Sequence, residues 1–394
     1  MRWPRRAGKR GAAKDGSDGL DGWKRINRER RGMSLQAEIK KQFSGFCLEV
    51  SLQTEQGIMG ILGASGSGKS MTLKCIAGIE TPDTGRIILN GRTLFDSQKR
   101  INLPPQKRRV GYLFQNYALF PNMTVTANIA AGIKGSRTEK KAAVEKMTEL
   151  FRLKGLERRY PSQLSGGQMQ RVALARILAS RPDVIMLDEP FSALDDYLKE
   201  ELQLEVKKVL DAYRGDVLFV THSRDEIYRF CGSCVILNQG RAECFGSARE
   251  MFQHPRSVTA ARLTGCKNIS PAKKLGPRRI EALDWKIALN TAEEVGDEVE
   301  FVGIHARHLS ISAYAQPEGV PRENGPENQF LCRYQGALSR PFETDILLEP
   351  VSGSAQKPLW CSIAPDHLKR LPGLTQGALA ALSIRPGDIL LLKA

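Results

Sequence analysis

Residues 57–78, GIMGILGASGSGKSMTLKCIAG, place an apolar run, a glycine-rich turn and a helix-forming segment in immediate succession. The run Ile58–Leu62 predicts a buried strand, and the segment that begins at Lys69 predicts a helix. Between them, the spacing G-x-x-x-x-G-K-S sets Gly63, Gly66 and Gly68 where side chains would obstruct a backbone that turns its N–H groups inward. This order predicts a phosphate-binding loop in an α/β domain.

The spacing of this motif predicts which residues contact a nucleoside triphosphate. Lys69 is expected to reach the β- and γ-phosphates, and the Ser70 hydroxyl is expected to ligate Mg²⁺. The nucleotide-binding residues expected here are Gly63, Ala64, Ser65, Gly66, Ser67, Gly68, Lys69, Ser70 and Met71.

A second apolar run, in PDVIMLDEPFSALD (182–195), is followed directly by two acidic residues. Residues 184–187 are uniformly apolar, as expected for a central parallel strand that is buried on both faces. Asp188 then lies at the carboxyl end of that strand, where α/β sheets place their ligands. We expect Asp188 to hold Mg²⁺ through water and Glu189 to polarise the attacking water as a general base.

A third strand, DVLFV (216–220), leads into Thr221 and His222. A lone histidine after a strand is more often structural than catalytic. The expected sheet order, however, brings this strand end to the edge that carries Asp188 and Glu189. His222 is therefore expected to contact the γ-phosphate and to hold the water in line.

A second phosphate-type loop lies a hundred residues after the first, in LSGGQMQRVALARILAS (164–180). Its Ser-Gly-Gly turn precedes an expected helix, so backbone N–H donors and the helix dipole favour an anion there. A single chain thus carries two loops suited to phosphate.

Composition indicates a globular chain, with 41% hydrophobic residues among 394, and its length suggests about two domains. The formal net charge of +16 would raise nucleic acid as a partner, but residues 1–32 hold 11 Lys or Arg against 4 Asp or Glu. Because this stretch supplies +7 of the charge, no nucleic-acid partner is expected. No apolar run approaches the roughly 18 residues of a membrane span, and no secretory signal is visible, so a cytosolic chain is expected.

Eight cysteines are scattered without a repeating framework, as expected for reduced thiols. The one close pair, Cys231 and Cys234, leaves two interpretations, a metal or redox site and a structural pair. The second is favoured, because no further pair or histidine cluster accompanies it and CVIL (234–237) predicts a buried strand.

Six motifs follow the order found in ATP-binding-cassette ATPases, which residues 34–264 therefore resemble. They are GASGSGKS, Gln115 in GYLFQNYALFP, LSGGQ, VIMLDEP, SALD and THS. The resemblance implies an α/β P-loop cassette with a mostly parallel sheet and a helical signature subdomain. It also implies a head-to-tail homodimer, in which each ATP lies between the phosphate-binding loop of one chain and the signature of the other. The two loops would then be two halves of one site.

The resemblance also implies residue roles. Glu189, His222 and Gln115 are the expected catalytic residues, and Ser70, Gln115 and Asp188 are the expected Mg²⁺ ligands. Asp195 is expected to link the two hydrolytic sites. The signature residues expected to bind the partner's ATP are Leu164, Ser165, Gly166, Gly167 and Gln168.

Two further contacts follow from the same resemblance. An aromatic residue before the first core strand usually stacks on adenine, and KKQFSGFCLEV offers Phe43 and Phe46. Phe43 is favoured, while a plain core role stays open for either. The segment NYALFPNMTV (116–125) is expected to form the groove for a permease's coupling helix.

After residue 264, short alternating segments separated by glycine and proline predict a small all-β, OB-like barrel. The wider pattern resembles the molybdate and sulfate branch of importer ATPases, and residues 325–394 resemble a Mop/TOBE-type domain with a possible oxyanion ligand. This implies uptake of molybdate through permease subunits at the cytoplasmic face of a bacterial membrane, with an extracytoplasmic binding protein as indirect partner. Sulfate, tungstate, iron, polyamine or sugar import, a soluble regulatory ATPase and a passive oxyanion store remain alternatives.

The expected organisation is an extension over 1–32, a cassette over 33–264, a connecting region over 265–324 and a barrel over 325–394. The extension is Gly-, Arg- and Asp-rich, so it predicts disorder. RERRG before Met33 can be encoded by purines alone, which indicates a ribosome-binding site and a native start at Met33. The alternative is a basic arm for anionic lipid.

Overall fold

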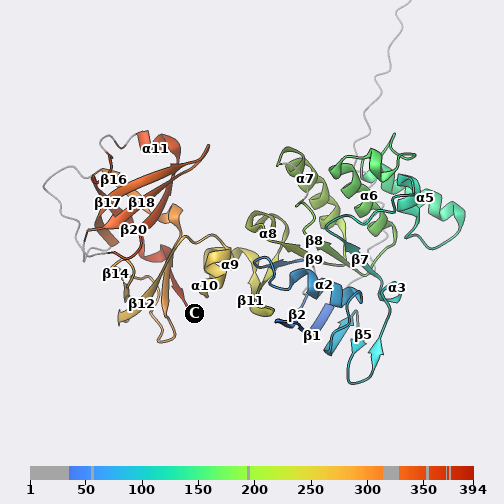
Figure 1. Cartoon of the computed structure of the whole chain (residues 1–394), viewed down its shortest axis with the longest axis horizontal. Helices are drawn as coiled ribbons and strands as arrows, with labels where there is room; N and C mark the ends of the chain where they lie inside the picture. The colour runs from blue at the N-terminus through green and yellow to red at the C-terminus, as the bar shows by residue number, and fades with distance from the viewer. Residues whose placement is uncertain are drawn as a thin grey trace, which may run out of the picture.

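The computed structural model describes residues 35–54, 57–192, 196–313, 328–351, 355–369, 371 and 374–394. The expected extension, the start at Met33 and Asp195 lie outside the described residues. Figure 1 shows a mixed helix-and-sheet body from the first two thirds of the chain and a mainly β body with the short helix α11 from the last third, with α9 and α10 between them.

The first body is built on one eleven-stranded sheet of order β6-β5-β4-β1-β2-β11-β10-β3-β9-β8-β7. Strands β10, β3, β9, β8 and β7 run parallel, and the side that holds β1, β2, β4, β5 and β6 is antiparallel. The bounds are β1 (Leu35–Phe43), β2 (Phe46–Gln53), β3 (Ile58–Leu62), β4 (Thr84–Leu89), β5 (Arg92–Asp96), β6 (Ile101–Asn102), β7 (Val110–Leu113), β8 (Val184–Asp188), β9 (Asp216–Thr221), β10 (Ser233–Asn238) and β11 (Arg241–Ser247).

The expectation of a mostly parallel sheet is wrong, because half of it consists of hairpins. Two-residue turns join β1 to β2 at residues 44–45 and β4 to β5 at residues 90–91, and such short links permit only antiparallel pairing. The parallel half needs long crossovers, and it is this half that carries the motifs.

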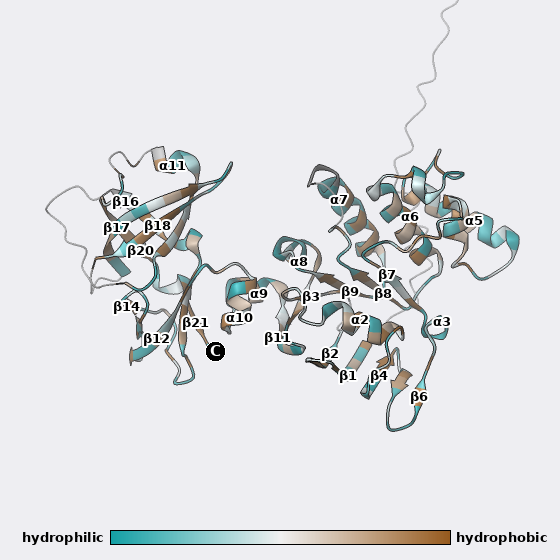
Figure 2. Ribbon diagram, in the orientation of Figure 1, coloured by the Kyte–Doolittle hydropathy of each residue, from teal (hydrophilic) through white to brown (hydrophobic). Residues whose placement is uncertain are grey.

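The three strands predicted from apolar runs are confirmed as β3, β8 and β9. Every residue of β8 and β9 is buried, as expected for central parallel strands that are covered on both faces. Figure 2 shows hydrophobic colouring concentrated on these central strands. One core cluster lies against α2 and the other against α6 and α7, which gives layers on both faces of the sheet.

Two helices of this body were predicted, and both start as expected, α2 at Lys69 and α6 directly after Ser165. The helices of the body are α2 (Lys69–Ala77), α3 (Pro105–Arg108), α4 (Val125–Ala130), α5 (Arg137–Leu150), α6 (Gly166–Ala179), α7 (Asp196–Ala212), α8 (Arg224–Phe230), α9 (Ala248–Gln253) and α10 (Val258–Leu263), with the single 3₁₀ turn η1 (Pro161–Gln163). None of the helices within the described ranges is long and apolar enough to cross a membrane.

The second body contains two five-stranded sheets, β14-β13-β12-β15-β21 and β16-β20-β17-β18-β19. Their strands are β12 (Asn268–Gly276), β13 (Arg279–Ala282), β14 (Ile287–Asn290), β15 (Phe301–Ile304), β16 (Ser310–Ala313), β17 (Asn328–Ser339), β18 (Thr344–Pro350), β19 (Leu359–Ile363), β20 (Leu379–Ile384) and β21 (Ile389–Leu392). The short helical turns are η2 (Ala306–His308), α11 (Pro365–Lys369) and η3 (Pro386–Asp388).

Strands from before and after residue 325 alternate in this body. β21 pairs with β15, and β16 pairs with β20, while side chains of both sheets share one core around Trp285. The boundary expected at 325 is therefore not a boundary of sheet or core. The strand pairs of the described residues form two open sheets rather than the closed barrel that we expected.

Candidate functional site

In the phosphate-binding loop, the Lys69 side chain bonds to the backbone of the loop itself. Its Nζ donates hydrogen bonds to the carbonyl oxygens of Gly63 and Ala64, both at 2.9 Å. A Cβ at Gly63 would lie 2.3 Å from the carbonyl oxygen of Leu237, and Gly68 caps α2 with a φ of 100°. Only glycine meets both demands, so the loop can hold this curled shape.

Two groups in the loop fit an anionic ligand. The Ser67 hydroxyl is buried and has no hydrogen-bond partner among the described residues. Burial lowers the pKa of Lys69, although the charges of Glu189 and Asp188 oppose that shift. A phosphate would satisfy both groups at once, because it supplies acceptor oxygens and negative charge.

Asp188 lies at the end of β8 and has both carboxylate oxygens engaged. Ser70 donates its hydroxyl to Oδ1 at 2.8 Å, and Tyr112 donates its hydroxyl to Oδ2 at 2.8 Å. Burial, together with the charge of Asp188, raises the pKa of Tyr112 far above its ordinary value, so the phenol keeps its proton. A hydroxyl and a carboxylate side by side form the oxygen donor set that Mg²⁺ prefers.

Tyr112 was not predicted from the sequence. It lies on β7, opposite Met186 of β8, so only the strand register brings its hydroxyl to Asp188. The one sequence signal is a polar-tipped residue in a strand whose neighbours are apolar.

Glu189 brings the other predicted catalytic residues together. Its carboxylate lies 3.3 Å from His222 Nδ1 and 3.5 Å from Gln115 Nε2. The residue has a φ of 47°, in the left-handed region, and its N–H donates to the carbonyl of Val220 at 2.9 Å. This turn directs the chain sharply after β8, and such strained positions concentrate at functional sites.

The segment that carries His222 is held by a buried carboxylate. Thr221 donates its hydroxyl to Glu226 at 2.7 Å and accepts the N–H of Ser223 at 3.0 Å. Lys199 of α7 pairs with the same Glu226 at 2.7 Å. These bonds join β9, α7 and α8, so they fix the backbone on both sides of His222.

The second loop begins α6 as predicted. Ser165 is the N-cap, its hydroxyl accepts the N–H of Gln168, and Gln168 in return accepts the N–H of Ser165. Ser165 is exposed, and among the described residues no hydrogen bond or ion pair joins Leu164–Gln168 to the first loop. The N–H groups of Gly166 and Gly167 open a fourteen-residue helix, where an anion is favoured.

The two candidate adenine platforms lie next to each other at the β1–β2 turn. The rings of Phe43 and Phe46 are 6.1 Å apart and tilted, and both are half-buried. A Cβ at Gly68 would lie 3.1 Å from Phe46, so Phe46 is the ring that contacts the phosphate-binding loop.

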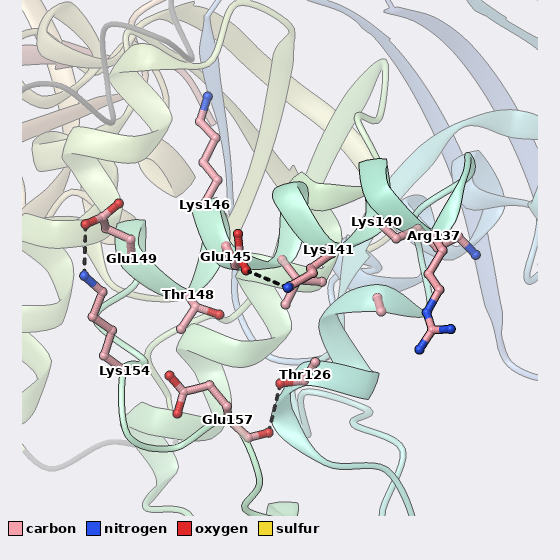
Figure 3. A pocket seen from close by; sticks show the side chains of 12 residues that line it. Thr126, Arg137, Lys140, Lys141, Glu145, Lys146, Thr148, Glu149, Lys154 and Glu157 are labelled. Atoms are coloured by element: carbon pink, nitrogen blue, oxygen red, sulfur yellow. Dashed lines mark hydrogen bonds and ion pairs between the residues drawn. The ribbon is translucent and has the colours of Figure 1, made fainter.

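A groove of about 1130 Å³ lies along α5, beside the start of α4. Ala130 and Val144 are among its apolar lining, and Lys and Glu side chains surround them, including the pairs Lys141–Glu145 and Lys154–Glu149 in Figure 3. None of residues 116–125, which the sequence analysis expected to form the groove for a coupling helix, lines it.

The close cysteine pair lies in the interior of the first body. Cys231 and Cys234 are free and buried, and burial raises the pKa of Cys234 to about 12. Within the part of the chain that the structure describes, no cluster of three metal-ligating side chains occurs. The strand β10 contains Cys234, as the structural interpretation expected.

Comparison with known proteins points to one family. The family model described as ABC transporter matches residues 48–192. The sulfate/thiosulfate import ATP-binding protein CysA of Synechococcus elongatus is 42% identical over 241 residues, which cover 60% of this chain and 68% of that protein. The spermidine/putrescine import ATP-binding protein PotA of Oleidesulfovibrio alaskensis is 35% identical and covers 68% of this chain and 76% of that protein.

Two further matches cover a smaller part of this chain. The Fe(3+) ions import ATP-binding protein FbpC of Haemophilus influenzae is 41% identical over 58% of this chain and 65% of that protein. Among solved structures, the dimeric bacterial ABC transporter cassette MJ0796 is 26% identical with a TM-score of 0.47, over 55% of this chain and 99% of that chain.

Proposed function

Because this chain belongs to the ABC transporter family and is an ATP hydrolase, we propose that it powers the uptake of an oxyanion through a partner membrane permease. The observation that carries the proposal is the convergence of Lys69, Ser70, Asp188, Glu189 and His222 at one end of the parallel strands. These residues supply phosphate, metal and water contacts in one place.

In this proposal each residue has a separate task. Lys69 and the loop N–H groups hold the β- and γ-phosphates of ATP, and a Mg²⁺ ion held beside them would supply further positive charge to the phosphate oxygens. Ser70, Gln115 and Asp188 are the residues that would hold the metal. Glu189 orients the attacking water and takes its proton, and His222 steadies the γ-phosphate side.

The second loop is assigned to a second copy of the chain. Ser165 and the two glycines after it are accessible at the start of α6, and no bond described above joins them to the first loop. A head-to-tail homodimer would bring this loop to the γ-phosphate of the other chain, so ATP would hold the dimer together. Hydrolysis removes the shared γ-phosphate and lets the two chains separate.

The groove along α5 is the proposed contact for the permease. Its lining combines apolar side chains with Lys and Glu side chains, which suits a short amphipathic helix from a membrane partner. The two ion pairs drawn in Figure 3, Lys141–Glu145 and Lys154–Glu149, are solvent-exposed, so a helix could enter without breaking buried ion pairs.

The cargo is proposed as a tetrahedral oxyanion. The relative CysA is named for sulfate and thiosulfate import, which supports the oxyanion class. The sequence expectation named molybdate, and none of the relatives reported above is named for it. PotA and FbpC are named for polyamine and iron import, so those cargoes are the alternatives to test.

The test is cargo uptake by the source cell after loss of this chain. Uptake of labelled sulfate, molybdate, iron and spermidine should be measured with no chain, with the wild type and with Glu189→Gln. The proposal expects that cells without this chain lose uptake of sulfate or molybdate but keep uptake of iron and spermidine. Uptake should return with the wild-type chain and not with Glu189→Gln. Loss of iron or spermidine uptake instead would reject the cargo, and no loss of any uptake would favour a soluble regulatory ATPase.

A further inference from the structure

A second pocket lies at the junction of the two bodies, away from the ATP site. It has a volume of about 720 Å³ and is bounded by α8, α9, the connector after α10, the η2 turn, the β17–β18 hairpin and β19. The connector approaches α8 closely, since a Cβ at Gly265 would lie 1.8 Å from Nη1 of Arg224. Glycine at 265, with a φ of 96°, therefore permits the pocket to form.

The pocket lining is rich in positive charge. Five Lys or Arg residues line it against two carboxylates: Arg224, Arg229, Lys267, Arg307 and Arg340 against Asp225 and Glu343. The fully buried Asp345 neutralises one more of these positive charges. Lys267 contacts both of its carboxylate oxygens at 2.6 Å, and Arg340 lies 3.4 Å away. Two positive charges remain in excess, and Arg307 has no ion pair within the described residues.

His305 adds an unpaired acceptor to the same pocket. The residue is 5% exposed, and its Nε2 has no hydrogen-bond partner among the described residues. Burial lowers the pKa of His305 to about 4, and the nearby His308, Arg307 and Arg224 add to that shift, while the backbone of Phe252 opposes it. The imidazole is therefore neutral at pH 7, and an unprotonated ring nitrogen accepts a hydrogen bond.

The two observations together select a ligand. The excess of Arg and Lys favours an oxyanion, and the buried acceptor favours a ligand that also donates a hydrogen bond. Sulfate and molybdate carry no proton at pH 7, whereas hydrogen phosphate is a dianion with one hydroxyl. We propose that the junction pocket binds inorganic hydrogen phosphate, with its charged oxygens on Arg224, Arg307 and Arg340 and its hydroxyl on His305.

The position of the pocket gives such binding a consequence for hydrolysis. Arg224 is the first residue of α8 and follows His222 by two positions. Arg229, on the last turn of α8, donates to Gln203 of α7 at 2.6 Å. A phosphate held between α8 and the second body would therefore restrain the segment that carries His222.

The experiment is titration calorimetry on the full chain with Mg²⁺ and a non-hydrolysable ATP analogue, so that the phosphate-binding loop is filled. Phosphate, sulfate and molybdate are titrated separately at pH 7 and constant ionic strength. The proposal expects saturable binding of one phosphate per chain, and affinity for sulfate and molybdate at least tenfold weaker.

Variants locate the site. Arg307→Gln should weaken phosphate binding at least tenfold, and His305→Phe should reduce the preference for phosphate over sulfate. Arg214→Gln removes the same charge from an exposed arginine outside the pocket and should leave binding unchanged. Absence of saturable phosphate binding, an equal loss in Arg214→Gln, or sulfate binding as tightly as phosphate would each overturn the proposal.

Discussion

Asp188 is the residue on which the metal side of the site depends, because its two oxygens accept hydroxyl groups from two different elements. Ser70 comes from the start of α2 and Tyr112 from β7. A carboxylate fixed at both oxygens keeps one orientation toward the metal. Groups that orient a metal-side residue commonly change metal affinity or activity by about 10–100-fold when removed.

Tyr112→Phe should therefore raise the Mg²⁺ concentration that gives half-maximal ATPase activity by about tenfold. ATP binding without metal should stay close to the wild type, because Lys69 and the loop are untouched. The matched control is Tyr117→Phe, since the Tyr117 hydroxyl is buried without a hydrogen-bond partner in the described part of the chain. ATPase activity measured against Mg²⁺ concentration separates the two variants, and equal curves would remove Tyr112 from the metal side.

Glu189→Gln should slow hydrolysis by about 100-fold or more while it keeps ATP bound. The amide retains the size of the carboxylate and its place beside Gln115 and His222, but it cannot take a proton from water. Sedimentation with ATP and Mg²⁺ should then show a dimer. A monomer under saturating nucleotide would contradict a site shared between two chains.

At the scale of elements, the two phosphate-type loops make different predictions. Lys69→Ala should weaken ATP binding by at least about tenfold, because it removes a charged donor from a partly dehydrated loop. Ser165→Arg should leave ATP binding by a single chain nearly intact and lower hydrolysis by about 100-fold, since it obstructs the helix start that the other chain's γ-phosphate needs.

Ser165→Arg also removes a helix cap, so it needs a control for stability. Ser136 caps α5 with the same reciprocal pair of bonds, to Glu139, and lies outside both loops. Ser136→Arg should cost a similar amount of folding stability, about 1 kcal/mol, and leave hydrolysis unchanged. If both serine variants lose hydrolysis equally, the second loop has no special part in it.

The elements that sequence alone predicted well are those with local causes. The strands β3, β8 and β9 are short apolar runs buried on both faces, and the loop from Gly63 to Ser70 has fixed spacing. The hairpins of the antiparallel half also have local causes, the two-residue turns at 44–45 and 90–91, and the sequence analysis missed them. The contact of Tyr112 with Asp188 instead arises from pairing between β7 and β8, which lie far apart in the chain. Such pairing leaves no local pattern, so the sequence could not reveal it.

At the scale of the molecule, the end of the chain ties the two bodies together. β21 pairs with β15 in the second body, while Leu390 and Leu392 pack on Val258 and Ala261 of α10. Backbone bonds also join Lys393 to Arg256 and Val258. The last strand is thus part of a core that begins before residue 270, which the alternating segments after residue 264 did not indicate.

This arrangement changes how a role for residues 325–394 should be tested. A chain that ends at residue 324 loses β17–β21, and the buried faces of β13, β14 and β15, including Ile280, Leu289 and Val302, lose their partners. Residues 268–313 should then unfold along with the deleted part, because the strands that remain, β12–β16, have lost the second sheet that covers their apolar surface. If this truncation changed the effect of an oxyanion on ATPase activity, the change would reflect unfolding of the second body rather than loss of a single oxyanion-binding site.

The matched comparison is a chain that ends at residue 264, which keeps α10 and exposes its apolar contact with β15 and β21. Limited proteolysis should cut the longer truncation rapidly within residues 268–313, whereas the shorter one should keep its cassette and its ATP binding. Protection of residues 268–313 in the chain ending at 324 would contradict the shared core. A cooperative loss of the cassette in the chain ending at 264 would show instead that α10 depends on β21, because Val258 and Ala261 would have lost the leucines that cover them.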